Sequence, residues 1–232
     1  MFTKLFYWLL KKFSSTKAKL LCVGVENSRY AGTLSGASKG IKQLFSKLKT
    51  RCEYSKLLID LEATRGRVLS EIKNVCDSDL TVIIFNCHGG QKYGKQNETD
   101  NMDEFLALYD GPLVDNEIWN VISKAKGRVL LVFDCCHSET MFRSFEKFLD
   151  ERSAIPDLLV WSACADNKLS YGLGNNGGIL THVLIKKIRW YRTYNMIWKM
   201  LVKNRQISKY ENIKQTMLLG KNSKFNNHFF LS

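Results

Sequence analysis

Two short apolar runs of this chain each end in residues that can do nucleophilic chemistry. The run 81–85 is followed by Asn-Cys-His-Gly-Gly at 86–90, and the run 129–132 is followed by Phe-Asp-Cys-Cys-His-Ser at 133–138. Short aliphatic runs with abrupt polar ends are typical of parallel strands that deliver side chains to the carboxyl edge of an α/β sheet, where ligands bind. The two segments therefore indicate a Cys/His site at one sheet edge.

A cysteine that attacks a carbonyl carbon needs a neighbouring imidazole, because a protonated thiol is a weak nucleophile. His88 and Cys136 supply these two groups, and the chain between them has room for one further β-unit, so adjacent strands can bring them together. Gly89 allows the backbone to approach a substrate closely. Its N–H, together with that of Cys136, is predicted to hold the developing oxyanion.

The other reactive side chains have structural explanations that must be weighed against a catalytic role. Cys87 and Cys135 lie at the ends of apolar runs and are predicted to be buried structural thiols. A zinc site built from Cys87, His88, Cys136 and His137 is disfavoured, because neighbouring residues on an extended chain point to opposite faces. For His137 both a structural and a functional role stay open.

The elements that must position these residues alternate between strand and helix. Strands are predicted over 19–25, 54–61, 81–85, 128–133, 157–162 and 228–231, and helices over 37–48, 64–75, 115–122 and 177–190. Thr64 is the predicted cap of its helix. The polar stretch 91–103 is too long for a simple connector and is predicted to be a functional or mobile loop. This order predicts an α/β layered sandwich, with a mainly parallel sheet flanked by helices.

Both strand-end segments resemble segments of metacaspases and bacterial caspase-like peptidases. The residues at 86–91 resemble Ser-Gly-His-Gly-Gly-Gln, and those at 134–138 match Asp-Cys-Cys-His-Ser. Further matches in the chain are Val-Gly-Val at 23–25, Leu-Ser-Gly at 34–36, Ser-Ala-Cys-x-Asp at 162–166 and Gly-Gly-Ile-Leu-Thr at 177–181. The resemblance implies a caspase-like peptidase domain over 19–232, which is preceded by an amphipathic segment over 1–18.

In the family that the chain resembles, the histidine of His-Gly is the base and the cysteine before His-Ser is the nucleophile. The resemblance therefore implies a cysteine endopeptidase with His88 as base and Cys136 as nucleophile, acting on protein or peptide substrates. It also implies that Asp134 lines a pocket for Arg or Lys at P1, with Asp166 and Asn86 as further substrate-binding residues.

Several positions depart from the family pattern. Lys39-Gly40 stands where the family commonly has Asn-Asp, so one pocket carboxylate is missing and the selection for a basic P1 residue is predicted to be weaker. Asn86-Cys87 replaces the usual Ser-Gly, and Glu139 replaces a glycine. The rival interpretation is a catalytically weak or inactive caspase-like interaction module, whose basic carboxyl-terminal region binds nucleic acid, acidic partners or a membrane.

Calcium is a further expectation from the resemblance, and no other cofactor is expected. Asp103, Glu104, Asp115 and Asn116 fall near the acidic positions that bind calcium in metacaspases, and hard oxygen ligands suit this ion. The alternative is that Asp115 and Asn116 cap a helix.

Positive charge is concentrated in the last third of the chain. The formal net charge is +13, and Glu211 is the single acidic residue after His182. The basic residues there are interleaved with Trp and Tyr, which permits a face for nucleic acid or acidic partners. Because no nucleic-acid-binding motif accompanies them, we favour a solvated helix face with its aromatic rings turned inward.

The amino-terminal segment carries its large apolar residues on one helical stripe: Phe2, Leu5, Phe6, Leu9 and Phe13. The pattern permits an amphipathic helix at a membrane surface, and the favoured alternative is a helix packed on the domain or on a partner. No run approaches the roughly 20 apolar residues of a spanning helix. An odd total of seven cysteines argues against a disulfide framework and predicts a reducing, cytoplasmic setting. The protein is also expected to be a monomer.

Overall fold

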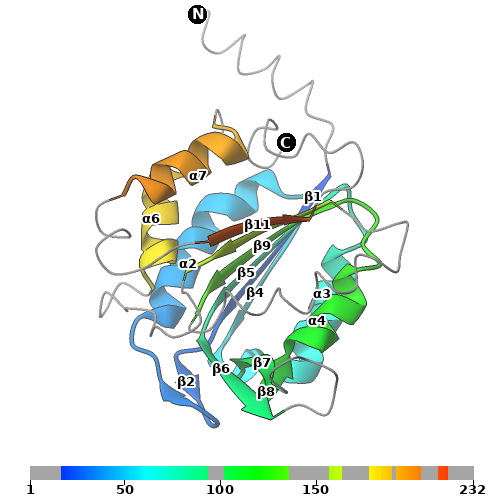
Figure 1. Cartoon of the computed structure of the whole chain (residues 1–232), viewed down its shortest axis with the longest axis vertical. Helices are drawn as coiled ribbons and strands as arrows, with labels where there is room; N and C mark the ends of the chain where they lie inside the picture. The colour runs from blue at the N-terminus through cyan, green and yellow to red at the C-terminus, as the bar shows by residue number, and fades with distance from the viewer. Residues whose placement is uncertain are drawn as a thin grey trace, which may run out of the picture.

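A six-stranded sheet is the middle layer of the fold (Figure 1). The structure, a computed structural model, describes residues 17–93, 102–135, 157–163, 178–189, 192–204 and 214–218, the last as backbone only. The strand order is β11-β10-β9-β5-β1-β4. The strands are β1 (Ala18–Gly24), β4 (Tyr54–Ile59), β5 (Leu80–Asn86), β9 (Arg128–Asp134), β10 (Leu158–Ser162) and β11 (Lys214–Leu218). All are parallel except β11, which is antiparallel to β10.

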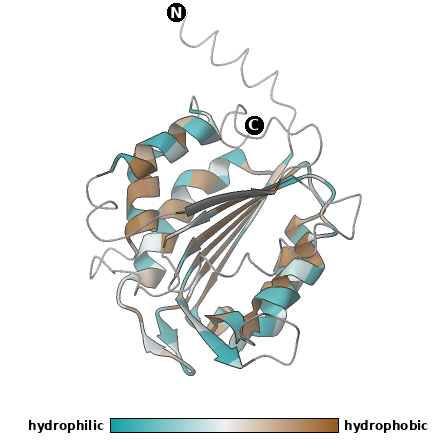
Figure 2. Cartoon of the chain, in the orientation of Figure 1, coloured by the Kyte–Doolittle hydropathy of each residue, from teal (hydrophilic) through white to brown (hydrophobic). Residues whose placement is uncertain are grey.

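Helices cover both faces of this sheet, and the predicted layered α/β sandwich is confirmed. One face is covered by α2 (Ala37–Leu48), α6 (Ile179–Lys187) and α7 (Tyr194–Val202), and the other by α3 (Arg65–Val75) and α4 (Asp115–Ile122) (Figure 1). Figure 2 shows the inner strands as hydrophobic and the helices as mixed. Strands that are buried on both faces read as continuous apolar runs, and these runs marked the strands in the sequence although they show no two-residue period.

A second, smaller sheet follows β5 directly. It consists of β6 (His88–Tyr93), β7 (Met102–Ala107) and β8 (Pro112–Val114), all antiparallel. The predicted loop over 91–103 is therefore wrong at both of its ends, because 91–93 and 102–103 are paired strand residues. A ribbon of β2 (Asn27–Ser28) and β3 (Gly32–Thr33) and the 3-10 turns η1 (Lys49–Arg51) and η2 (Asp60–Glu62) complete the described elements.

Other boundaries also differ from prediction. The strand expected over 54–61 ends at Ile59, where the turn η2 begins, and the helix expected over 177–190 spans Ile179–Lys187. The helix α7 and the strand β11 were not predicted as elements. The strand expected over 228–231 and the segment 1–16 lie outside the described residues. Among the described residues, no helix combines the length and apolar character that crossing a membrane requires.

The aromatic side chains of α7 confirm the inward orientation that was expected. Tyr194 is fully buried, and its ring centroid lies 6.2 Å from that of Trp161 on β10. Trp198 stacks on the same ring at 6.2 Å. These contacts attach α7 to the sheet.

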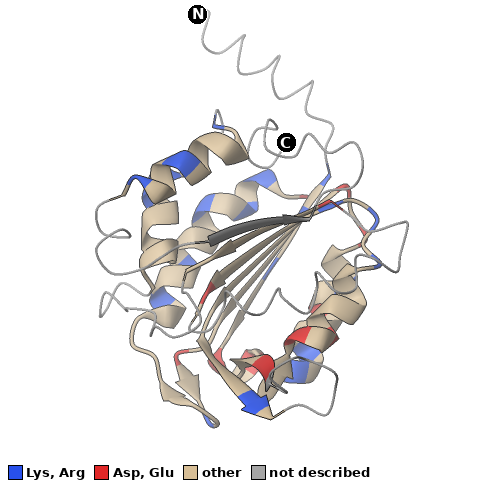
Figure 3. Ribbon diagram, viewed as in Figure 1, with Lys and Arg blue, Asp and Glu red and all other residues tan. Residues whose placement is uncertain are grey.

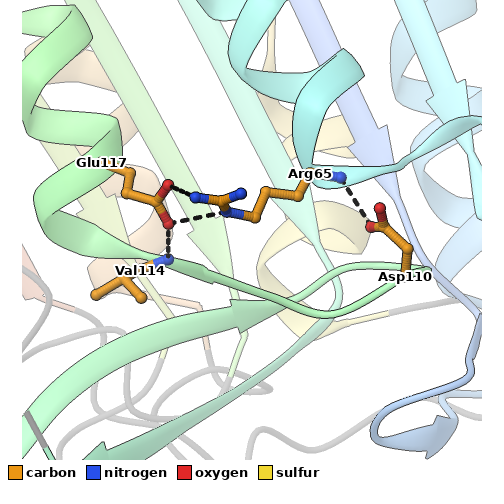
Figure 4. Close-up of polar contacts among 4 residues, drawn as sticks. All are labelled: Arg65, Asp110, Val114 and Glu117. Atoms are coloured by element: carbon orange, nitrogen blue, oxygen red, sulfur yellow. Dashed lines mark hydrogen bonds and ion pairs between the residues drawn. The ribbon is translucent and has the colours of Figure 1, made fainter.

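The amino end of α3 is held by a residue from outside the helix. Thr64 occupies the predicted cap position but makes no side-chain cap bond; instead the Arg65 backbone N–H donates to Asp110 Oδ1 over 2.8 Å. The Arg65 guanidinium pairs with Glu117, whose Oε2 also accepts from the Val114 backbone N–H (Figure 4). Half-exposed ion pairs of this kind contribute at most about 1 kcal/mol, so their role is to align α3 with α4.

Asp60 fastens the loop that follows β1. Its Oδ1 accepts hydrogen bonds from the backbone N–H groups of Glu26, over 2.7 Å, and Asn27, over 2.9 Å. Its Oδ2 accepts from the Ser38 hydroxyl over 2.9 Å. Asp60 has φ 46°, a left-handed conformation that Asp and Asn tolerate better than most residues.

We expect Asp60→Ala to lower the free energy of unfolding by about 2–4 kcal/mol, because a carboxylate acceptor of three hydrogen bonds is lost. Asp60→Asn keeps an acceptor oxygen and tolerates the backbone conformation, so its loss should be smaller. Urea denaturation of both variants measures the difference. Equal losses for Ala and Asn would contradict the carboxylate's role in holding the loop.

Candidate active site

Three neighbouring parallel strands end together at the carboxyl edge of the sheet. The register pairs Gly24 of β1 with Asn86 of β5, and Asn86 with Asp134 of β9. One position earlier, the rings of Phe85 and Phe133 stack with centroids 5.4 Å apart. This pairing places the two polar segments singled out in the sequence at the same edge.

His88 begins strand β6 two residues after Asn86. Its backbone pairs with Ala107 of β7, so the hairpin that follows the sheet edge fixes its position. The side chain is half-buried, and Nε2 is buried without a hydrogen-bond partner among the described residues. An imidazole nitrogen in this condition can form a hydrogen bond with a group that comes close to it. Gly89, the next residue, is also half-buried in β6.

Asp134 is buried at the end of β9 and lies against the first turn of α6. Its Oδ2 accepts a hydrogen bond of 2.7 Å from the Thr181 backbone N–H. Burial raises the pKa of this carboxyl above its ordinary value, and hydrogen bonds from Thr181 and from the Leu180 backbone act in the opposite direction. Gly178 leaves the space that the carboxylate fills, because a Cβ at this position would collide with it. Oδ1 has no partner among the described residues.

Asn86 is joined to the same helix. Its side chain is fully buried, and Nδ2 donates to Thr181 Oγ1 over 3.4 Å, whereas Oδ1 finds no hydrogen-bond partner within the described ranges. Thr181 therefore contacts both strand-end side chains, one through its backbone and one through its hydroxyl. Thr181 was not predicted as a site residue, although the Gly-Gly-Ile-Leu-Thr pattern at 177–181 is a sequence signal that includes it.

The remaining predicted site residues divide into two groups. Cys87 and Cys135 are each 1% exposed, so the prediction of buried thiols is confirmed. Cys136 and Asp166 lie outside the described residues, as does His137. The described part of the chain thus contains His88, the predicted base, and Asp134, the predicted pocket residue, with Asn86 paired to Asp134 in the sheet.

The four predicted calcium ligands all lie within the described residues, on β7 and at the start of α4. No three His, Cys, Asp or Glu side chains there are arranged to hold a metal ion. Glu104 of β7 is buried and accepts a hydrogen bond of 3.1 Å from Gln91 Nε2, while Asp103 precedes it on the strand. Asp115 opens α4, and its Oδ1 accepts from the Asn116 backbone N–H over 2.7 Å. Calcium binding stays a prediction, and the proposed reaction does not depend on it.

A mainly parallel sheet between two helical layers, with a histidine and a buried aspartate at adjoining strand ends, defines a caspase-like domain. The family model described as the caspase domain matches residues 19–221 of the chain. The chain belongs to this family.

Individual relatives are distant. Metacaspase-2 of Trypanosoma brucei brucei is 20% identical, over 92% of this chain and 75% of the relative. The inactive metacaspase-4 of the same organism is 24% identical, over 49% and 40% of the two chains. Among solved structures, protein GSU0716 of Geobacter sulfurreducens has a TM-score of 0.75 at 20% identity, covering 93% of this chain and 98% of that one. Caspase-1 of Spodoptera frugiperda has a TM-score of 0.61 at 13% identity and 93% coverage of both chains. At these identities the solved structures establish the fold alone.

The burial of Asp134 predicts a pH-dependent effect of Asp134→Asn. Because the folded-state pKa is raised, ionising this carboxyl costs stability as the pH rises above the ordinary value of about 3.8. We therefore expect the Asn variant to melt higher than the wild type at pH 7, by about 2–4 °C for each kcal/mol gained. The difference should shrink as the pH falls toward 4. Thermal melts of both proteins between pH 4 and 8 test this, and a difference that grows on acidification would contradict it.

Proposed function

We propose that the protein is a cysteine endopeptidase in which Cys136 attacks the peptide carbonyl and His88 transfers the proton. The observation that carries the proposal is the strand-end alignment: Asn86 is paired with Asp134, and His88 and Cys136 each follow one of these residues by two positions. Among the described residues, the buried Nε2 of His88 has no hydrogen-bond partner, which supports a role for this histidine as the base.

The reaction follows from these groups. The thiol gives its proton to His88, and sulfur forms a bond to the carbonyl carbon of the substrate. The negative charge that develops on the carbonyl oxygen is stabilised by the backbone N–H groups of Gly89 and Cys136. His88 then protonates the leaving amine as the C–N bond breaks, and water hydrolyses the acyl-enzyme with His88 as base.

The proposed specificity is for Arg or Lys at P1, with Asp134 as the pocket acid. Its Oδ1 is buried and finds no partner in the described ranges, so a guanidinium or ammonium group there would supply the missing positive charge. Such a cation also opposes the effect of burial on the pKa of Asp134 and favours the ionised form. We include Asn86 and Asp166 as further pocket residues.

The decisive variants are Cys136→Ala and His88→Ala. Each should lower kcat/KM by at least about 10³-fold, because removing one member of a nucleophile–base pair removes most of the chemistry. The control is Cys135→Ala, which removes the adjacent, buried thiol and should leave most of the activity. Fluorogenic peptide turnover and mass-spectrometric labelling by a peptidyl electrophile measure both effects. Full turnover by Cys136→Ala would overturn the assignment.

Substrate preference is tested separately with peptides that end in Arg, Lys or Asp. We expect Arg and Lys to exceed Asp in kcat/KM by about tenfold or more, and Asp134→Ala to remove most of this preference. Assays with added calcium and with a chelator show whether the ion contributes. Cleavage after Asp at the same rate as after Arg would contradict the proposed pocket without affecting the dyad.

An inactive interaction module is the second candidate, and the similarity to an inactive metacaspase favours it. The departures at Gly40, Asn86, Cys87 and Glu139 point in the same direction. An active peptidase is labelled at Cys136 by the peptidyl electrophile and cleaves the peptide substrate, whereas an inactive module folds but does neither. The labelling experiment above therefore separates the two candidates.

A further inference from the structure

The described part of one helical layer carries Lys and Arg residues but no Asp or Glu. The ranges 37–51, 178–189 and 192–204, which contain α2, η1, α6 and α7, have no Asp or Glu. We call these three ranges the basic layer. Its Lys and Arg residues are Lys39, Lys42, Lys47, Lys49, Arg51, Lys186, Lys187, Arg189, Arg192, Lys199 and Lys203. In Figure 3, α2, α6 and α7 carry blue and no red, whereas red segments lie on the opposite layer.

Like charges lie close together within this layer. Lys47 of α2 donates a hydrogen bond from Nζ to the carbonyl of Ile185 in α6, which joins the two helices. Burial lowers the pKa of Lys47, and the positive charges of Arg189 and Arg192 lower it further. An anionic partner would weaken the repulsion among these like charges, because it brings negative charge close to them.

The exposed surface of α7 combines this charge with apolar side chains. Met196, Lys199, Val202 and Lys203 are all exposed, and their spacing of three or four residues places them along one stripe. Met196 is 44% exposed and Val202 48%. The aromatic rings of α7, which could stack on nucleic-acid bases, are instead packed on Trp161. Exposed aliphatic side chains beside lysines favour a lipid surface over a nucleic acid.

The first described residues of the chain lie beside the amino ends of β5 and β4. The carbonyls of Lys17 and Ala18 accept hydrogen bonds from Leu80 and Glu53, at the beginnings of β5 and β4. Arg51 lies two residues before Glu53, so the chain enters the sheet at the edge where α2 ends. The sequence before this point carries the apolar stripe of Phe2 to Phe13 with interspersed lysines.

We propose that the basic layer binds the surface of an anionic lipid bilayer, with Lys and Arg contacting headgroups and with Met196 and Val202 reaching the acyl boundary. Basic side chains near such a surface are attracted to its anionic headgroups, so several acting together give stable adsorption that salt weakens. The surface lies on α2, α6 and α7, while the candidate active site lies at the carboxyl edge of the strands.

The test is co-sedimentation of the full chain with vesicles of phosphatidylcholine alone or with about 30% phosphatidylserine. We expect binding to the anionic vesicles only, and at least a tenfold loss for the double variant Lys199→Glu/Lys203→Glu. The matched control is Lys73→Glu/Lys124→Glu, which makes the same change in net charge with exposed lysines of the opposite layer. Binding that survives the first variant, or that falls equally in the control, would overturn the proposal.

A second variant tests the lipid assignment without changing charge. Met196→Gln/Val202→Gln should weaken vesicle binding and leave binding to the soluble polyanion heparin unchanged. Unchanged vesicle binding, or oligonucleotide binding in place of vesicle binding, would rule out a lipid surface. The inference does not rest on the peptidase activity: Cys136→Ala should bind vesicles like the wild type, and Lys199→Glu/Lys203→Glu should keep the wild-type turnover.

Discussion

The parallel pairing of β5 with β9 is the constraint on which the rest of the site depends. Seven residue pairs are in register from Leu80 and Arg128 to Asn86 and Asp134, and the stacked rings of Phe85 and Phe133 precede the last pair. A slip of one residue would send every side chain of one strand to the wrong face, because the side-chain period of a strand is two. The register therefore sets both the apolar core and the sheet edge at which His88 and Asp134 emerge.

Asp134 shows what this arrangement costs in stability. The fold buries a carboxyl group whose two oxygens are unequally satisfied: Oδ2 accepts from α6, and Oδ1 has no partner among the described residues. A buried carboxylate without full compensation is unfavourable for folding, and such groups are retained where ligand binding needs them. Two residues at the amino end of α6 accommodate this group: Gly178 leaves the space that the carboxylate fills, and the Thr181 backbone N–H donates a hydrogen bond to it.

The sequence was most informative where local pattern and burial agree. The bounds of α2 follow directly from its apolar spacing, and all five predicted central strands that the structure describes match within about two residues at each end, because most of them are continuous apolar runs. The hairpin of β6 and β7 was missed for two reasons. Strand β6 is polar and half-buried, so hydrophobicity does not mark it, and β7 joins polar residues to the buried apolar residues Phe105, Leu106 and Ala107 without a two-residue period. Thr64 occupies the cap position while Asp110 supplies the bond. Such a partner, 45 residues away, is set by tertiary packing and cannot be found from local sequence.

The proposed peptidase activity and the proposed membrane binding use different parts of the same parallel topology. Strand carboxyl ends gather the reactive side chains at one edge, since each crossover returns the chain in the same direction. The same crossovers bring α2 and α6 alongside each other, so that both helices end away from that edge with their lysines and arginines close together. Cations near helix carboxyl ends are favoured by the helix dipole, which helps the fold to accommodate this accumulation of positive charge. A membrane bound there would leave the strand ends accessible to a peptide.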